Sequence, residues 1–215
     1  IDAEESWLQP AIDLLAEEQM LLHNRIQAVI FTTVQLYRHD RLAYLKALTD
    51  KAQSSGFRLG VKLVRGAYME KERFRATKIG APSPIQPDKQ ATDRDYDAAL
   101  DWCVEHTDTV SLCAGSHNEA SSLLLCSKMK EAGLAVGDDR IWFAQLLGMS
   151  DPISFNLAAA GYNVAKYVPY GPIRETIPYL IRRAEENTSV AGQSSRELEL
   201  IRSEFKRRSQ VNRAR

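Results

Sequence analysis

Ala28-Val-Ile-Phe-Thr-Thr-Val-Gln35 and Leu59-Gly-Val-Lys-Leu-Val-Arg-Gly66 are short runs rich in β-branched and apolar residues, the composition of buried β-strands. The stretch between them, residues 41–53, is predicted to be a helix that stops before Gly56. A strand, a helix and a second strand in this order predict parallel strands joined by a right-handed crossover.

The same alternation extends over the rest of the chain. A helix is predicted at residues 8–22, ahead of the first strand. Further strands are predicted at 109–114, 141–146 and 164–168, and further helices at 96–106, 118–132, 152–160 and 177–187. With Ile1-Asp2 counted as the stub of a strand, the chain holds six βα units.

Doubly wound sheets and (β/α)₈ barrels both show this alternation. A doubly wound sheet usually has a Gly-rich turn after its first strand, and no G-x-G-x-x-G occurs in this sequence. Polar residues instead occur where strands end, at Asp2, Gln35, Arg65, His117, Gln145 and Tyr167. This placement favours the C-terminal face of a barrel, where βα loops form active sites. We therefore expect a distorted α/β barrel of the TIM type, with about six of its eight βα units in this chain and the first two strands in a missing N-terminal portion.

Composition excludes several classes of protein. The 215 residues are 44% hydrophobic and 26% charged, as in a globular domain with a core of its own. Lys plus Arg and Asp plus Glu both number 28, so the net charge is zero and nucleic acid is not the expected partner. The three cysteines show no C-x-x-C spacing, which favours a reducing compartment and buried thiols. No apolar run is long enough to span a membrane, and His117 has no partner at metal-ligand spacing.

Residues 66–92 depart from the regular alternation. This stretch is charged and contains Pro82, Pro84 and Pro87, so we expect a long loop inserted between a strand and a helix. Such a loop could form a lid or a wall of a cofactor site, or it could be an ordinary solvated surface loop.

Residues 62–68 form the first cluster that could carry chemistry. Strand alternation places Lys62 and Val64 on one face and Leu63 and Arg65 on the other. Gly66 and Ala67 leave room for a flat ligand at the strand end. A buried Lys needs an anionic or electron-rich partner, such as a flavin that gains negative charge on reduction. The alternative is a Lys that faces solvent.

Two further clusters have both a functional and a structural interpretation. Ser116-His117-Asn118 lies between a strand and a helix, where it could cap the helix or hold a phosphate or ribityl chain. Tyr179, Arg182, Arg183 and Glu186 share one helix face. Paired arginines suit bidentate capture of a carboxylate, with the Glu holding one of them, although a solvated, salt-bridged face uses the same residues.

Together these segments resemble the proline dehydrogenase family, and its stand-alone members more than its bifunctional ones. The matching segments occur in the family's order and extend to about residue 190. They are Ile1-Asp-Ala-Glu-Glu5, Thr32-Thr-Val-Gln35, Lys62-Leu-Val-Arg-Gly-Ala-Tyr68, Ser116-His-Asn118, Gln145-Leu-Leu-Gly-Met149, Lys166-Tyr-Val-Pro-Tyr-Gly-Pro172 and Tyr179-Leu-Ile-Arg-Arg183 with Glu186.

The resemblance implies a barrel that binds FAD at the C-terminal ends of its strands. It implies oxidation of L-proline to Δ¹-pyrroline-5-carboxylate by hydride transfer to the flavin N5, with the electrons passed to a quinone, as the first step of proline catabolism. The implied location is the bacterial cytoplasm or inner-membrane periphery, or the mitochondrial matrix or inner membrane. Two alternatives remain: a non-catalytic or incomplete barrel fragment, and another FAD barrel of the methylenetetrahydrofolate reductase type.

The resemblance also implies roles for individual residues. The catalytic group is Lys62, Asp2 and Tyr167. The substrate-binding group is Arg182, Arg183, Glu186, Tyr167 and Tyr68, with Asp2 near Arg182. The cofactor-binding group is Gln35, Lys62, Val64, Arg65, Gly66, Ala67, Ser116, His117, Asn118 and Gln145.

We expect the barrel to occupy residues 1–193 and a basic amphipathic tail helix to follow at 194–215. Leu198, Ile201 and Phe205 share one helical face, and the tail has seven Lys or Arg against three Glu. Such a helix could contact anionic lipid, dock on the barrel or remain solvated.

Overall fold

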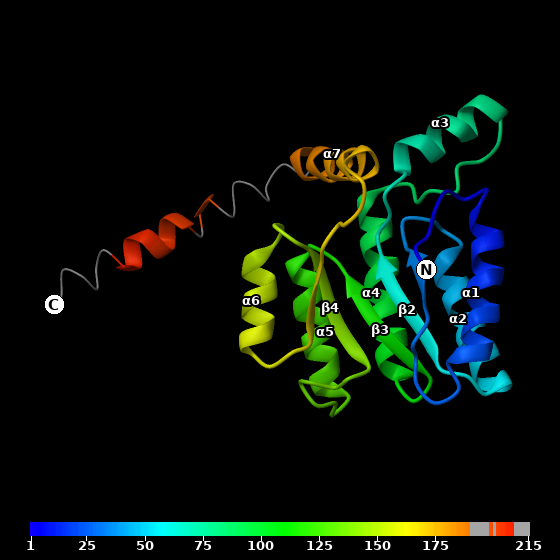
Figure 1. Ribbon diagram of the computed structural model, residues 1–215, viewed down its shortest axis with the longest axis horizontal. Coiled ribbons are helices and arrows are strands. Elements are labelled where there is room, and N and C mark those ends of the chain that lie inside the picture. Colours follow the sequence, from blue (N-terminus) through cyan, green and yellow to red (C-terminus); the bar gives the residue numbers. More distant parts are fainter. Residues whose placement is uncertain (190–197, 200, 209–215) are drawn as a thin grey trace. The chain divides into compact units, whose positions relative to one another are not determined.

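The computed structural model describes residues 1–189, 198–199 and 201–208, and the side chains of residues 182–189 lie outside this description. The chain divides into two compact units, Ile1–Tyr167 and Val168–Arg215. Figure 1 follows the chain through both of them.

The first unit is built on a five-stranded parallel sheet. Its strands are β1 (Phe31–Gln35), β2 (Leu59–Val64), β3 (Val110–Gly115), β4 (Ile141–Leu146) and β5 (Val164–Tyr167). They pair in chain order, β1-β2-β3-β4-β5, and every pair is parallel. A doubly wound sheet reverses its strand order at a switch point, whereas a barrel does not. The observed order is therefore that of consecutive barrel strands, as expected.

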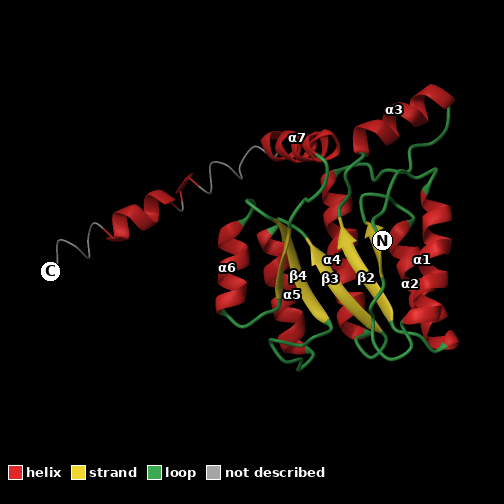
Figure 2. Ribbon diagram, in the orientation of Figure 1, coloured by secondary structure: helices red, strands yellow, loops and turns green. Residues whose placement is uncertain are grey.

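Helices precede and connect the strands of this unit (Figure 2). They are α1 (Gln9–His23), α2 (Arg41–Ser55), α3 (Met69–Ile79), α4 (Lys89–Glu105), α5 (Glu119–Glu131) and α6 (Asp151–Ala159). Helix α2 contacts β1 and β2, α4 contacts β2 and β3, and α6 contacts β4 and β5. These three helices thus pack on the strands that they connect, which is the arrangement of a βα repeat.

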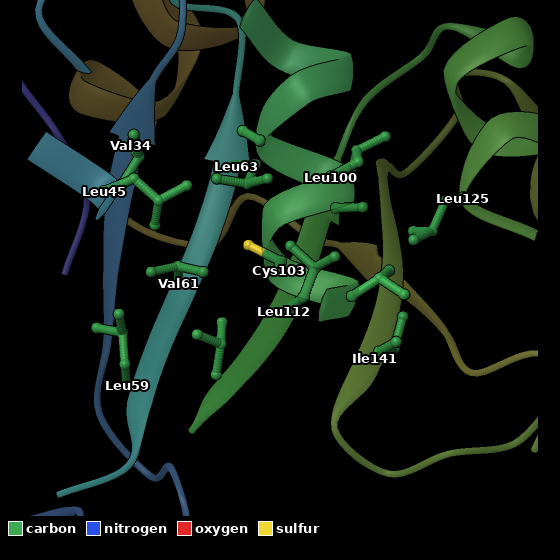
Figure 3. Close-up of a cluster of buried hydrophobic side chains, with 14 of the residues drawn as sticks. Val34, Leu45, Leu59, Val61, Leu63, Leu100, Cys103, Leu112, Leu125 and Ile141 are labelled. Atoms are coloured by element: carbon green, nitrogen blue, oxygen red, sulfur yellow. The ribbon is translucent and has the colours of Figure 1, made fainter. Parts of the chain in front are cut away.

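The hydrophobic core lies between the sheet and these helices (Figure 3). Alternate residues of β2 enter it: Leu59, Val61 and Leu63 are completely buried. They meet side chains from the helices, among them Leu100 and Cys103 of α4. Burial raises the pKa of the Cys103 thiol well above its ordinary value, so this cysteine acts as a small apolar core residue.

The first two residues do not form the strand that we expected. The ammonium group of Ile1 donates a 2.7 Å hydrogen bond to the carbonyl oxygen of Phe31, and Thr33 Oγ1 donates to the Ile1 carbonyl oxygen at 3.0 Å. Ile1-Asp2 thus runs beside β1 without forming a ladder, and the described sheet has five strands rather than six.

The segment 66–92 is not the irregular loop that we expected. It contains the helix α3, which ends at Ile79 with Gly80 as its C-cap, and α4 already begins at Lys89. Asp88 caps α4 by accepting a hydrogen bond from the backbone N–H of Ala91 at 2.7 Å. Two features of the sequence made this segment resemble a loop. Prolines lie between the two helices, and α3 is rich in charged helix formers, so it has only a weak version of the apolar pattern that indicates a helix.

In the second unit, α7 (Ile173–Ser189) begins four residues before the predicted start at 177 and includes Pro178. The extra turn is held by hydrogen bonds from the backbone N–H groups of Glu175 and Thr176 to the carbonyl oxygen of Pro172, both 3.0 Å. Residues 201–208 are helical, with Ile201 and Phe205 exposed. The other residues of the expected tail helix lie outside the described part, apart from 198–199. None of the described helices is long and apolar enough to cross a membrane.

Candidate active site

The face of the sheet turned away from the core carries the predicted chemistry. Thr33, Lys62, Cys113 and Trp142 are register partners across β1 to β4, so their side chains form one row. The next row toward the strand ends holds Val64 of β2 beside Gly115, Ala144 and Ala165 of β3 to β5. Lys62 and Val64 therefore share a face, as strand alternation predicted.

Lys62 is paired with a carboxylate on this face. Its ammonium group forms a short ion pair with Asp2 Oδ1, and Thr33 Oγ1 lies 3.4 Å from the same oxygen. Partial burial pushes the pKa of Asp2 upward, but the hydrogen bond and charge of Lys62 outweigh it and hold that pKa below its usual value. The anionic partner that a half-buried Lys requires is thus supplied by the chain itself.

Small residues make a flat floor beside this pair. A Cβ added at Gly115 would lie 3.0 Å from the carbonyl oxygen of Leu63 and 3.1 Å from Val64 Cγ1. Ala144 and Ala165 continue the row. Gln35, the register partner of Val64, is only 3% exposed, and its amide makes no hydrogen bond with another described residue. A planar ring with a polar edge would fit this floor and satisfy the amide, so these residues fit a flavin.

The turn after β2 requires glycine. Gly66 has φ +139°, and a Cβ there would lie 2.3 Å from Cδ1 of the buried Tyr37 ring. Ala67 and Tyr68 follow, and the Tyr68 hydroxyl donates a 2.7 Å hydrogen bond to Glu4 Oε2. The turn thus joins β2 to the same N-terminal segment that supplies Asp2.

Replacing Gly66 with Ala is expected to destabilise the fold by about 3 kcal/mol, because backbone strain and the clash with Tyr37 act together. Gly133→Ala is the matched control, since Gly133 also has a positive φ (+68°) but its added Cβ would meet nothing within 4 Å. Urea denaturation of the two variants measures the difference. Equal losses of stability would show that the Tyr37 contact does not constrain residue 66.

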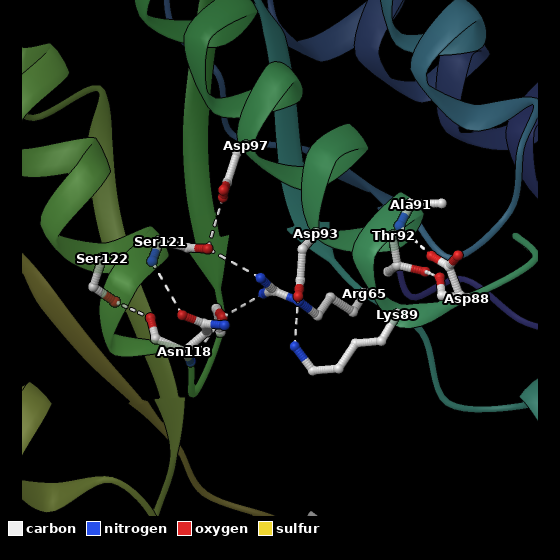
Figure 4. A network of polar contacts seen from close by, with 11 residues as sticks. Arg65, Asp88, Lys89, Ala91, Thr92, Asp93, Asp97, Asn118, Ser121 and Ser122 are labelled. Atoms are coloured by element: carbon white, nitrogen blue, oxygen red, sulfur yellow. Dashed lines mark hydrogen bonds and ion pairs between the residues drawn. The ribbon is translucent and has the colours of Figure 1, made fainter.

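Arg65 is directed at polar side chains of α4, α5 and the loop before α5 (Figure 4). Its Nε donates to Asp93 Oδ1 at 2.7 Å, its Nη1 to Ser116 Oγ at 2.8 Å and its Nη2 to Ser121 Oγ at 3.0 Å. The guanidinium also lies over the ring of Tyr96, 4.3 Å from its centre. Arg65 therefore joins the end of β2 to α4 and α5.

The loop Ser116-His117-Asn118 follows β3 and starts α5. Asn118 is the N-cap of this helix, because its Oδ1 accepts the backbone N–H of Ser121 at 3.1 Å. Ser116 Oγ accepts from Arg65 and from the backbone N–H of Asn118, the latter at 3.0 Å. His117 Nδ1 lies 3.0 Å from Ser150 Oγ. The capping interpretation is thus confirmed for Asn118, while Ser116 makes no such cap.

Gln145 lies on the buried side of β4, in step with the core residues Ile141 and Phe143. Its Nε2 donates to the Ser116 carbonyl oxygen at 3.2 Å, and its Oε1 accepts from Ser154 Oγ at 2.9 Å. Gln145, like Arg65, donates a hydrogen bond to Ser116 and so helps to fix the position of the loop Ser116-His117-Asn118.

Two links between distant segments were missed by the sequence analysis. Glu72 of α3 is 1% exposed, and its carboxylate accepts two hydrogen bonds from Ser6. The backbone N–H of Ser6 donates one at 2.5 Å, and the Oγ of Ser6 donates the other at 2.7 Å. Lys71 pairs with Glu5. No local pattern signals such contacts, because the partners are 66 residues apart.

The predicted substrate residues divide between the two units. Tyr167 ends β5 and is half exposed. Tyr179, Arg182, Arg183 and Glu186 lie on α7 at the expected helical spacing, and the side chains of the last three are outside the described part. Among the described residues, no group of three or more His, Cys, Asp or Glu could hold a metal ion.

Parallel strands paired in chain order, with helices in the connections between them, define an α/β domain of the barrel type. The chain belongs to the proline dehydrogenase family, whose model, described as "Proline dehydrogenase", matches residues 1–196.

Named relatives agree with this membership. The chain is 43% identical over 211 residues to human "Proline dehydrogenase 1, mitochondrial", covering 97% of this chain and 35% of that protein. It is 42% identical to "Hydroxyproline dehydrogenase" of Xenopus laevis, covering 97% of this chain and 46% of that one. The chain thus spans between a third and a half of each of these two relatives.

A solved structure supports the fold. Proline utilization A (PutA) from Bdellovibrio bacteriovorus superimposes with a TM-score of 0.82 at 26% identity, covering 88% of this chain and 20% of that one. The expected barrel-type α/β fold is therefore confirmed, and the family implies a flavin cofactor.

Proposed function

We propose that the protein containing this chain is an FAD-dependent proline dehydrogenase that oxidises L-proline to Δ¹-pyrroline-5-carboxylate. The observation that carries the proposal is the Lys62–Asp2 pair beside a floor of small residues, in a chain of this family. FAD, when bound, supplies the acceptor for the hydride of the proline ring carbon next to nitrogen.

Lys62 and Gln35 serve the flavin ring in this proposal. The ammonium of Lys62 offsets negative charge that develops on the ring, and a half-buried site strengthens that effect. The Gln35 amide meets the polar edge of the ring. Asp2 keeps the ammonium in place and offers its ionised carboxylate to the ring nitrogen of proline. The proton on that nitrogen must leave before hydride transfer, and we assign its removal to water because no side chain in the described part of the chain is suited to be the base.

Arg182 and Arg183 bind the proline carboxylate, and Glu186 orders them. A fork of N–H donors matches a carboxylate in two-point contact, which gives orientation as well as affinity. Tyr167 and Tyr68 form walls against the proline ring. None of these contacts involves a covalent nucleophile, because hydride transfer needs orientation and exclusion of water.

The remaining cofactor residues divide into two groups. Val64, Gly66, Ala67 and the loop Ser116-His117-Asn118 touch the FAD. Arg65 and Gln145 act through that loop, since each of them donates a hydrogen bond to Ser116.

Turnover by the full-length protein tests the proposed function. With a redox dye as acceptor, L-proline should support dye reduction and form the pyrroline product, whereas L-alanine should not. Trans-4-hydroxy-L-proline belongs in the same assay, because the 42% identity to a hydroxyproline dehydrogenase nearly equals the 43% to a proline dehydrogenase. If the protein oxidised hydroxyproline but not proline, the substrate assignment would change to hydroxyproline. If it oxidised neither compound, the proposal would be contradicted.

We further propose that the electrons pass to a quinone in a membrane, at the mitochondrial inner membrane or the bacterial inner-membrane periphery. The tail at 194–215 would approach that surface. Its described part has Leu198, Ile201 and Phe205 exposed, and basic residues outnumber acidic ones. Apolar burial and about 1 kcal/mol per basic residue near anionic lipid would support peripheral contact.

Removing residues 194–215 from the full-length protein is expected to weaken binding to anionic vesicles, with less loss at high salt, where the charge contribution is screened. Flavin reduction by proline should be unchanged. Vesicle sedimentation at two salt concentrations, with neutral vesicles as the control, measures this. Unchanged vesicle binding, or loss of bound flavin, would instead assign the tail to the fold.

A further inference from the structure

Ser150 occupies a backbone conformation that serine rarely adopts. It has φ +53° and ψ +37°, and it is the one non-glycine residue with a positive φ in the described part of the chain. Left-handed backbone is costly for a residue with a Cβ and is routine only for glycine. Strained residues of this kind persist where the surroundings and a function require them.

The hydroxyl of Ser150 does not cap helix α6, although Ser150 lies at the N-cap position of that helix. Ser150 is the N-cap of α6, where a serine side chain normally accepts a backbone N–H of the first turn. Here it makes no such cap. Its Oγ lies instead 3.0 Å from Nδ1 of His117, in the loop after the neighbouring strand β3.

A buried circuit holds this contact in place. Ser154 donates its backbone N–H to the Ser150 carbonyl oxygen at 3.1 Å, and its Oγ lies 3.3 Å from the same oxygen. The same Oγ donates to Gln145, which donates to the Ser116 carbonyl oxygen. Gln145, Ser150 and Ser154 are each at most 4% exposed. The loops after β3 and β4 are therefore joined twice, once through the Ser116 backbone and once through the His117 ring.

We propose that Ser150 is a positioning residue for the cofactor: its hydroxyl fixes the orientation of the His117 imidazole against the bound FAD. A hydrogen bond at Nδ1 sets the rotation of the ring, and so sets the direction in which Nε2 points. The backbone strain is explained in the same way, because a glycine at residue 150 would relieve it but could not reach His117. This inference rests on the proposed function, in which His117 contacts FAD.

A double-mutant cycle on the FAD dissociation constant of the full-length protein tests the proposal. Ser150→Gly removes the hydroxyl and tolerates the positive φ, so apoprotein stability should hold or rise. FAD binding should weaken about fivefold, the effect of one lost hydrogen bond. In a His117→Phe background the same substitution should change FAD binding by less than about twofold. Ser127→Ala is the matched control, because it removes an exposed serine hydroxyl that bonds Glu131 on α5.

Two outcomes would overturn the inference: unchanged FAD binding by Ser150→Gly, or an equal loss with and without His117. The second result would assign Ser150 to loop stability alone. Ser150→Ala, which keeps the strain, should match Ser150→Gly in FAD affinity but not in thermal stability. Failure of the unsubstituted protein to bind FAD would instead reject the proposed function, and with it the role assigned here.

Discussion

Lys62→Met in the full-length protein is expected to lower kcat/KM for proline by about 10²-fold, the usual effect of removing one preorganised charge or donor at a reacting centre. The substitution deletes the only partner ammonium of Asp2 among the described ion pairs. It keeps an unbranched side chain over the Gly115 floor, so bound flavin should decrease much less than turnover. Stopped-flow reduction of the flavin by proline measures the chemical step directly.

The pH dependence provides a check on the same pair. The folded-state pKa of Asp2 lies below its ordinary value of 3.8, so the stability that the pair contributes is present above that value and is lost as pH falls through the lowered pKa. Between about pH 5 and 9, Asp2 is ionised and should add no inflection to kcat/KM. Lys51→Met, which removes an exposed lysine paired with Glu17, is the control and should leave turnover intact. A Lys62 variant as active as the Lys51 variant would contradict the assigned role.

Arg182→Lys and Arg183→Lys are each expected to lower kcat/KM for proline by at least tenfold. A charge-assisted hydrogen bond contributes roughly 1.5–3 kcal/mol, and lysine keeps the charge but not the two-point geometry. The loss should appear mainly as a higher KM, with bound flavin unchanged, because the two arginines are assigned to substrate alone.

Arg174→Lys is the matched control, since Arg174 lies on the first turn of the same helix and is exposed. It should retain full kcat/KM. Normal affinity for proline in both the Arg182 and Arg183 variants would show that this helix face is a solvated surface with no role in substrate binding.

The strands were predictable because their signal is local. β4 matches its predicted range, residues 141–146, and β2 ends two residues before the predicted Gly66. Helix α3 was missed because its charged residues give little apolar periodicity between Gly66 and the prolines. Ile1-Asp2 was misassigned as a strand, because whether two residues join a ladder depends on the neighbouring chain.

The residue types of the candidate site were predictable, but the partners of these residues were not. Alternation correctly separated Lys62 from Arg65. It could not identify Asp2 as the partner of Lys62, or Asp93 and Ser121 as the partners of Arg65, because these contacts join segments distant in sequence. Ser150 gave no signal at all, since its φ and its bond to His117 are properties of the folded loops.

Oxidation of proline by the bound flavin can be observed by adding L-proline to the purified full-length protein in the absence of oxygen. We expect the visible absorbance of the bound flavin to bleach as the flavin is reduced, and L-alanine at the same concentration to leave that absorbance unchanged. A protein that holds its flavin but keeps it oxidised under saturating proline would contradict the assignment.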